Sequence, residues 1–261
     1  MSVSDELKVE RRGHVLVVTI DRQDRLNALS DAVHVGLTET WHAAKDDPDL
    51  RAIVITGAGT RAFCTGMDLK GVQERGGFRP VVDDVHEELD TTPLQCDCWL
   101  PTVVAVNGVC AGAGFHFIAD ADVVVASSTA AFTDTHVSVG QVTALEPITL
   151  APRIGLGNAL RLAVLGRHLR IKADEALRIS LVDEVVEPEK LLDRAIELAE
   201  QCASGSPAAT EASKRAIRAG LELPMRDAMQ YGWELLLAHR DHPDATEGPR
   251  AFAEKREAQW Q

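Results

Sequence analysis

The stretch from Leu100 to Asp122, LPTVVAVNGVCAGAGFHFIADAD, constrains the fold more than any other part of the chain. It predicts a buried strand over Pro101–Val106, a tight turn at Asn107-Gly108 and a glycine-rich entry into a helix. Glycines there let another group approach the backbone closely, and the first N–H groups of a helix have no intrahelical partner. The pattern is therefore typical either of tight packing or of a turn that donates to a negatively polarised oxygen.

A second glycine-containing turn follows another apolar run. LRAIVIT (Leu50–Thr56) predicts a buried strand, and GAGTRAFCTGMDLKG continues from it into a helix expected to begin near Met67–Asp68. Two separate strand ends thus each carry a turn with exposed N–H groups. Two such donors converging on one point would form an oxyanion hole, although sequence spacing alone leaves that convergence open.

The rest of the chain alternates predicted strands and helices up to about residue 180 and is helical beyond it. The apolar run over His14–Ile20 does not alternate, which predicts a strand buried on both faces. Ser30 is the expected N-cap of a helix that ends near Lys45. Further strands are expected over Asp122–Ala126, Ala131–Phe132 and Leu181–Val186, and further helices over about Val81–Cys98, Pro147–Ile154, Asn158–Leu165, Ala173–Ile179, Pro188–Ala203, Pro207–Ala219, Pro224–His239 and Pro249–Trp260.

This change of composition predicts two regions with a boundary near Val186. Residues 1–186 are expected to form the core that carries the site. Residues 187–261 are expected to form a helical region that packs on the core or on a partner subunit, because its helices are amphipathic.

Composition excludes several classes of function. A net charge of −13 over 261 residues argues against a nucleic-acid partner, and the apolar runs are too short to span a bilayer. The N-terminus lacks the pattern of a secretory signal. The five cysteines are odd in number and lack metal-ligand spacing, so we expect no metal site and free thiols in a reducing cytoplasm. No G-x-S-x-G, H-E-x-x-H or Walker A motif occurs.

Four segments in this order, DRQDRLNAL, RAFCTGMDLKG, AVNGVCAGAGF and FAEKREAQW, make the chain resemble the enoyl-CoA hydratase/isomerase family, also called the crotonase superfamily. The resemblance covers nearly the whole chain. It implies an α/β fold, a spiral of ββα units followed by a C-terminal helical region that mediates trimers, which often pair into hexamers. It also implies an acyl-CoA thioester as substrate, with coenzyme A as part of that substrate and no separate cofactor.

The resemblance assigns roles to individual residues. The oxyanion hole would consist of the backbone N–H groups of Met67 and Ala113, the second being an alanine where the family usually has glycine. Because the donor is a backbone group, the alanine should be tolerated. Contacts with coenzyme A are expected from Arg25, Ala28, Asp68, Leu69, Lys70, Phe252 and Lys255.

The chain departs from the family at the two glutamates that hydratases use, because His116 and His136 occupy those positions. Histidine, with a reference pKa near 6.5, is a natural acid–base group at neutral pH. A further acid used by some members aligns with Ala144, and Glu146 lies two residues beyond it. Whether Glu146 reaches the site is left open by the sequence.

Several functions remain open at this point. The chain can be a lyase or hydratase with His136 as base, His116 as its partner and Glu146 as a third candidate. It can also be a retro-Claisen hydrolase that cleaves a carbon–carbon bond of a β-keto or cyclic acyl-CoA, since one branch of the superfamily has a histidine at the position of His136. A non-catalytic acyl-CoA binding protein and a purely structural oligomer component are the remaining alternatives.

Overall fold

The computed structural model describes residues 5–74, 76–77, 82–85 and 89–261. Its strands form a six-stranded sheet in the order β1-β2-β3-β5-β7-β10 and a four-stranded sheet in the order β4-β6-β8-β9. The first sheet is parallel except for the β1–β2 pair, and the second is parallel except for β8–β9. The strands are β1 (Leu7–Arg12), β2 (Val15–Ile20), β3 (Ala52–Gly57), β4 (Ala62–Cys64), β5 (Thr102–Val106), β6 (Val109–Ala111), β7 (Val123–Ser127), β8 (Ala131–Thr133), β9 (Ile171–Lys172) and β10 (Glu184–Val186).

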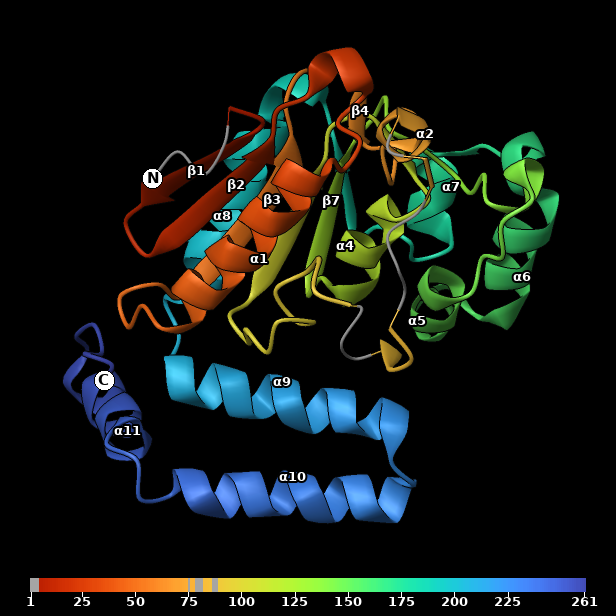
Figure 1. Ribbon diagram of the computed structural model, residues 1–261. Coiled ribbons are helices and arrows are strands. Elements are labelled where there is room, and N and C mark those ends of the chain that lie inside the picture. Colours follow the sequence, from red (N-terminus) through yellow and green to blue (C-terminus); the bar gives the residue numbers. More distant parts are fainter. Residues whose placement is uncertain (1–4, 75, 78–81, 86–88) are drawn as a thin grey trace.

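The six-stranded sheet is covered on both faces, as its unbroken apolar strands predict. Side chains alternate between the faces of a strand. In β2, Val15 and Val17 pack in the cluster formed with α8 (Leu191–Ala203), whereas Leu16 and Val18 face the larger core that includes α1 (Asp31–Lys45). Figure 1 shows α1 and α8 on opposite sides of these strands.

The chain spirals between the two sheets. Each of β3, β5 and β7 lies in the six-stranded sheet and is followed by β4, β6 or β8 in the four-stranded sheet. The helices α2 (Leu69–Glu74) and α4 (Gly114–Asp120) then follow β4 and β6. The structure therefore has the α/β spiral of ββα units that the resemblance implies, and it places the turns after β4 and β6 side by side through their parallel pairing.

Three expectations about the spiral need correction. The sequence analysis missed β1, and it treated residues of β4 and β6 as parts of loops because strands of three residues give little periodic signal. Asn107 does not close a simple turn. Its side chain accepts from Gly57 N and donates to Gly59 O and Ala62 O, which ties the end of β5 to the loop after β3.

The helix expected over Val81–Cys98 is wrong over residues 89–98, whereas Val85 is helical and its carbonyl accepts from Leu89 N at 3.0 Å. Residues 81 and 86–88 lie outside the described residues, and residues 89–98 form bends and turns. Backbone groups there bond locally, as in Cys98 N to Pro93 O, and Gln95 Oε1 accepts from Thr91 N and Thr92 N. Side-chain capping of this kind competes with helix formation.

The helices between β8 and β10 were predicted to within a few residues. They are α5 (Leu145–Ile154), α6 (Leu156–Leu165) and α7 (Ala173–Arg178). The last helix was misplaced: α11 is Asp244–Glu254, and Pro249 lies inside it instead of at its start. Lys255 ends α11 in the left-handed conformation, and Glu247 then accepts hydrogen bonds from Arg256 and from Gln259 N, which fold the tail back.

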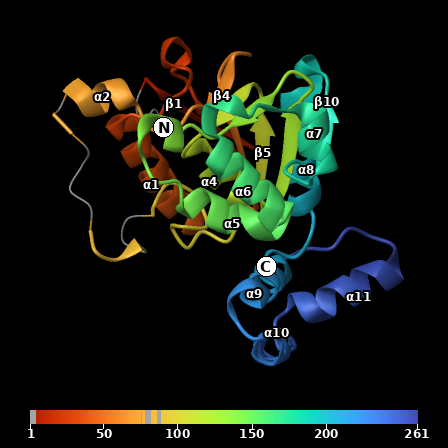
Figure 2. The same ribbon diagram turned by 90° about the vertical axis from the view of Figure 1, so that its right-hand side faces the viewer.

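The C-terminal helices do not all lie apart from the core. Although it belongs to the region expected to be a separate helical part, α8 packs on the six-stranded sheet. The hairpin of α9 (Pro207–Glu222) and α10 (Met225–His239) lies beyond the body in both views (Figures 1 and 2), followed by α11. The buried Lys214 joins α9 to the body, because its Nζ lies 2.7 Å from Asp122 Oδ2 and 3.1 Å from Leu100 O.

We predict that Gly114→Ala destabilises the protein by about 1–3 kcal/mol, because overpacking forces the backbone to shift. A Cβ at Gly114 would lie 2.6 Å from Cys64 O, at the point where α4 begins against β4. The matched control is Gly157→Ala in the exposed part of α6, where a Cβ would meet nothing within 4 Å. Alanine there should stabilise the helix by up to about 1 kcal/mol. Urea unfolding measures both, and equal effects would contradict this account of the α4 start.

Candidate active site

One possible oxyanion donor is oriented by a bridge between two loops. Leu29 N donates to Gly66 O at 2.8 Å, and Asp68 N donates to Leu29 O at 3.0 Å, so Leu29 bonds to both neighbours of Met67. In a parallel bridge of this kind the residue between the two bonded neighbours points its own N–H the other way. The N–H of Met67 is therefore directed away from Leu29.

The turn before α4 lies on that other side. Gly66 has a φ of +85°, and a Cβ built on it would lie 3.0 Å from Ala113 N and 3.4 Å from Gly112 Cα. Only glycine suits such a conformation and such crowding. Ala113 itself has φ −56° and ψ −14°, an ordinary conformation for an alanine. The two glycine-containing turns thus meet, and in the part of the chain that the structure describes neither Met67 N nor Ala113 N has an acceptor.

Both predicted histidines meet at the carboxylate of Glu146. His116 Nε2 lies 3.5 Å from Glu146 Oε1, and His136 Nε2 lies 3.8 Å from the same oxygen. Glu146 is in the first turn of α5, on the face that also buries Leu150 and Ile154. That helical face directs the carboxylate inward, where Glu146 and His116 are both only 6% exposed. Glu146 therefore reaches the site.

His136 also lies against the turn before α4. A Cβ at Gly112 would be 3.6 Å from His136 Cε1. The imidazole is thus adjacent to the turn that carries Ala113 N, which gives one site with a titratable group next to two unpaired backbone donors.

Asp134 fixes the tautomer of His136. The buried carboxylate of Asp134 accepts from both the backbone N and Nδ1 of His136 at 2.9 Å, and its other oxygen accepts from Thr143 Oγ1 at 2.7 Å. Because a carboxylate only accepts, Nδ1 of His136 carries the proton. Nε2 of the neutral ring then has a lone pair, which faces Glu146. The hydrogen bond to Asp134 outweighs burial and raises the pKa of His136.

The hydrogen bonds of Gln95 assign the opposite tautomer to His116. Gln95 Oε1 accepts from Thr91 N at 3.0 Å and Thr92 N at 3.2 Å, which leaves Gln95 Nε2 facing His116 Nδ1 at 3.4 Å. An amide nitrogen only donates, so His116 Nδ1 accepts and Nε2 carries the proton toward Glu146. Burial lowers the pKa of His116, which favours this neutral form.

The two histidines consequently have different roles at one carboxylate. His116 directs its Nε2 proton toward Glu146 Oε1, 3.5 Å away, whereas His136 and Glu146 each offer an acceptor. The distance of 3.8 Å between His136 Nε2 and Glu146 Oε1 is too long for a direct hydrogen bond. It is close to the separation of two acceptors that share one water, roughly 4.4 Å for two bonds of about 2.8 Å. The arrangement can therefore hold a water by both hydrogens and leave its oxygen free to attack.

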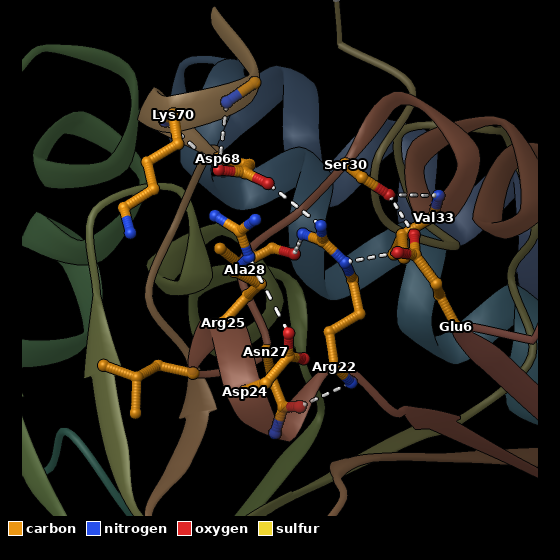
Figure 3. A network of polar contacts seen from close by, with 12 residues as sticks. Glu6, Arg22, Asp24, Arg25, Asn27, Ala28, Ser30, Val33, Asp68 and Lys70 are labelled. Atoms are coloured by element: carbon orange, nitrogen blue, oxygen red, sulfur yellow. Dashed lines mark hydrogen bonds and ion pairs between the residues drawn. The ribbon is translucent and has the colours of Figure 1, made fainter. Parts of the chain in front are cut away.

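The candidate coenzyme A residues fall into two groups. Arg25, Ala28, Asp68, Leu69 and Lys70 gather where the 3-10 helix Gln23–Arg25 meets α2, and Figure 3 draws Arg25, Ala28, Asp68 and Lys70 in this region. Phe252 and Lys255 are at the end of α11, which lies far from α2 in both views (Figures 1 and 2). Phe252 is 87% exposed. Within one chain the structure does not bring these two residues to the others.

Sequence reasoning missed Asp134, Gln95 and Arg22. The D-x-H spacing of Asp134 and His136 was a usable signal, because an Asp side chain often bonds the backbone two residues on. Gln95 and Arg22 gave no such local signal. The described residues contain no group of three His, Cys, Asp or Glu arranged to hold a metal ion, and no helix among them is long and apolar enough to cross a membrane.

Comparison with known proteins places these features in a family. The model of the enoyl-CoA hydratase/isomerase family matches residues 10–261. The (E)-benzylidenesuccinyl-CoA hydratase of Thauera aromatica is 34% identical, over 95% of this chain and 96% of that protein. The carnitinyl-CoA dehydratase of Salmonella enteritidis PT4 is 34% identical over 99% of each chain.

Solved structures agree with the sequence relatives. An enoyl-CoA hydratase/isomerase from Mycobacterium paratuberculosis superposes with a TM-score of 0.90 at 37% identity, covering 98% of each chain. An enoyl-CoA hydratase from Mycobacterium tuberculosis H37Rv gives a TM-score of 0.89 at 31% identity over 99% of each chain. With its family model, its relatives and its fold in agreement, the chain belongs to the enoyl-CoA hydratase/isomerase family, and it is an enzyme of the lyase or hydratase type.

Proposed function

We propose that this enzyme adds water reversibly to the double bond of a 2-enoyl-CoA thioester, with His136 as the general base. The observation that carries the proposal is the pair of acceptors, His136 Nε2 and Glu146 Oε1, beside the Gly112–Ala113 turn. The names of the two relatives, a hydratase and a dehydratase, support water addition or removal as the reaction class.

In this mechanism the thioester oxygen accepts from Met67 N and Ala113 N, which stabilise the enolate as negative charge develops on that oxygen. A water held by His136 and Glu146 attacks the β carbon, and one of its protons passes to His136 Nε2. The imidazolium, stabilised by Asp134, then returns the proton to the α carbon. The net change is the addition of one water across the double bond. His116 faces the Glu146 carboxylate with its Nε2 proton, 3.5 Å from Oε1.

The coenzyme A part would lie along Arg25, Ala28 and Asp68–Lys70. Arg25 is suited to a phosphate, because its side chain is 37% exposed and its ion pair with Asp24 is long at 3.7 Å. Phe252 and Lys255 would complete the pocket from a neighbouring subunit of a homotrimer or hexamer. Exposed apolar side chains along α9 and α10 support such an assembly: Ile217, Leu221, Met225, Met229, Trp233 and Leu236. Sedimentation equilibrium measures the mass of the assembly.

A retro-Claisen C–C hydrolase is the second candidate, because the Asp134–His136 pair is a base that can also direct water at a β-keto carbon. Mass spectrometry of products from saturated, 2-enoyl, 3-enoyl and β-keto acyl-CoA esters, straight-chain and cyclic, separates the candidates. Addition of the mass of one water to a 2-enoyl ester alone supports hydration, and shortened or ring-opened products indicate C–C hydrolysis. Binding with no product from any ester would favour a non-catalytic acyl-CoA binding protein.

His136→Ala should lower kcat by about 10²–10⁴-fold, the usual contribution of a positioned acid–base group. The affinity for the same acyl-CoA, measured by calorimetry, should change little because the oxyanion donors are backbone groups. His42→Ala, an exposed position on α1, is the matched control and should leave both quantities unchanged. Turnover near that of the wild type in His136→Ala would exclude His136 as the base.

The pH profile should report the pKa of His136. Because Asp134, and with a smaller effect Glu146, raise that pKa above the ordinary 6.5, kcat/KM should fall with decreasing pH from above 6.5, as His136 becomes protonated. Asp134→Asn should move this acid limb to lower pH, because an amide oxygen can still accept from His136 N and Nδ1 but a neutral side chain no longer stabilises the imidazolium by charge. An acid limb that stays in place in Asp134→Asn would contradict the assignment.

A further inference from the structure

The side chain of Arg22 is a buried cation that the proposed chemistry does not use. Arg22 follows β2 and is 9% exposed. Its guanidinium donates from Nε to Glu6 Oε1 at 2.8 Å, from Nη1 to Ala28 O at 2.6 Å and from Nη2 to Asp68 Oδ2 at 2.9 Å. A buried charge is costly unless it is paired and hydrogen-bonded, and these three acceptors meet that requirement for Arg22.

The three acceptors come from three separate segments (Figure 3). Glu6 precedes β1 and also accepts from Ser30 Oγ, the cap of α1. Ala28 directly precedes Leu29, and Asp68 directly follows Met67. One guanidinium therefore fastens both sides of the Leu29–Met67 bridge.

Asp68 extends this connection to the start of α2. Its Oδ2 pairs with Arg22, while its Oδ1 accepts from Lys70 N and Gly71 N at 3.2 Å. The backbone on the C-terminal side of Met67 is thus fixed by a cap as well as by the ion pair. On the N-terminal side, Gly66 O accepts from Leu29 N.

We propose that Arg22 is a positioning residue for the oxyanion hole: its bonds to Ala28 O and Asp68 keep the Leu29–Met67 bridge closed and so keep Met67 N–H directed at the thioester oxygen. This inference rests on the proposed function, because it needs Met67 N–H to be a donor in the reaction. Arg22 does not touch the substrate in this account. Arg22 acts through the backbone N–H of Met67. A substitution of the Met67 side chain keeps that N–H and therefore does not test the proposal.

The shape of the guanidinium, beyond its charge, is what the proposal requires. An ammonium group is a compact charge on a flexible stem and cannot reproduce a planar fork with fixed donor directions. Arg22→Lys keeps the charge but loses the simultaneous reach to Glu6, Ala28 and Asp68. A displaced oxyanion donor should cost part of the 10²–10³-fold that removal of a whole donor costs, so we expect kcat to fall about 10–100-fold with a smaller change in KM.

The test is infrared difference spectroscopy of bound butyryl-CoA labelled with carbon-13 at the thioester carbonyl, alongside kcat and KM on the 2-enoyl ester. Hydrogen bonds from an oxyanion hole lower the carbonyl stretching frequency, and a purely structural role of Arg22 would leave that shift unchanged. The proposal predicts a shift in the wild type that is reduced in Arg22→Lys. The matched control is Arg11→Lys on β1, where the side chain is 43% exposed and pairs with Asp47.

The outcomes separate this inference from the function on which it rests. A full wild-type shift that persists in Arg22→Lys, with kcat unchanged, would overturn the positioning role alone. A wild-type complex with no shift would overturn the proposed oxyanion hole itself. Should Arg22→Lys fail to fold, Asp68→Asn carries the test, because it keeps the size of the side chain and removes the charge that pairs with Nη2. A reduced shift in Asp68→Asn supports the proposal, and an unchanged one overturns it.

Discussion

One carboxylate oxygen, Glu146 Oε1, lies 3.5 Å from His116 Nε2 and 3.8 Å from His136 Nε2. The polar organisation of the site depends on how these two rings differ. Asp134 makes His136 an acceptor at Nε2, and Gln95 makes His116 a donor at the same atom. The lone pair of His136 Nε2 and the Glu146 carboxylate repel each other unless a water between them donates to both. The two tautomers therefore determine where a water can bind.

In the proposed mechanism, this arrangement accounts for how a chain with histidines at the positions assigned to the hydratases' two glutamates would hold a water. A water held by two acceptors has its oxygen free to attack. In the proposed mechanism the acceptors are Glu146, which comes from α5, and the imidazole of His136. His116 is not an acceptor for the water in this mechanism; its Nε2 proton faces the Glu146 carboxylate instead. The number of acceptors is thereby kept while the residues that supply them change.

Much of this fold could be predicted because buried parallel strands leave a strong signal. The unbroken runs in β2 and β3 predicted the core, and the sequence also marked the two glycine-containing turns that the structure brings together, whereas Met67 and Ala113 were assigned as donors only by the family resemblance. The position of Glu146 could not be predicted, because it depends on the helical face it shares with Leu150 and Ile154 and on how α5 packs. Arg22 and Gln95 were missed because their partners are distant in sequence or lie in turns without periodic pattern.

The different roles of the two histidines can be measured directly by nitrogen-15 NMR of the imidazole groups, because protonated and unprotonated ring nitrogens have distinct chemical shifts. Above the raised pKa of His136, the account predicts a proton on Nδ1 of His136 and on Nε2 of His116. Single substitutions at the two positions assign the signals. Protons on the same type of nitrogen in both rings would contradict the account, because His136 and Glu146 could not then share a water while His116 directs a proton toward that carboxylate.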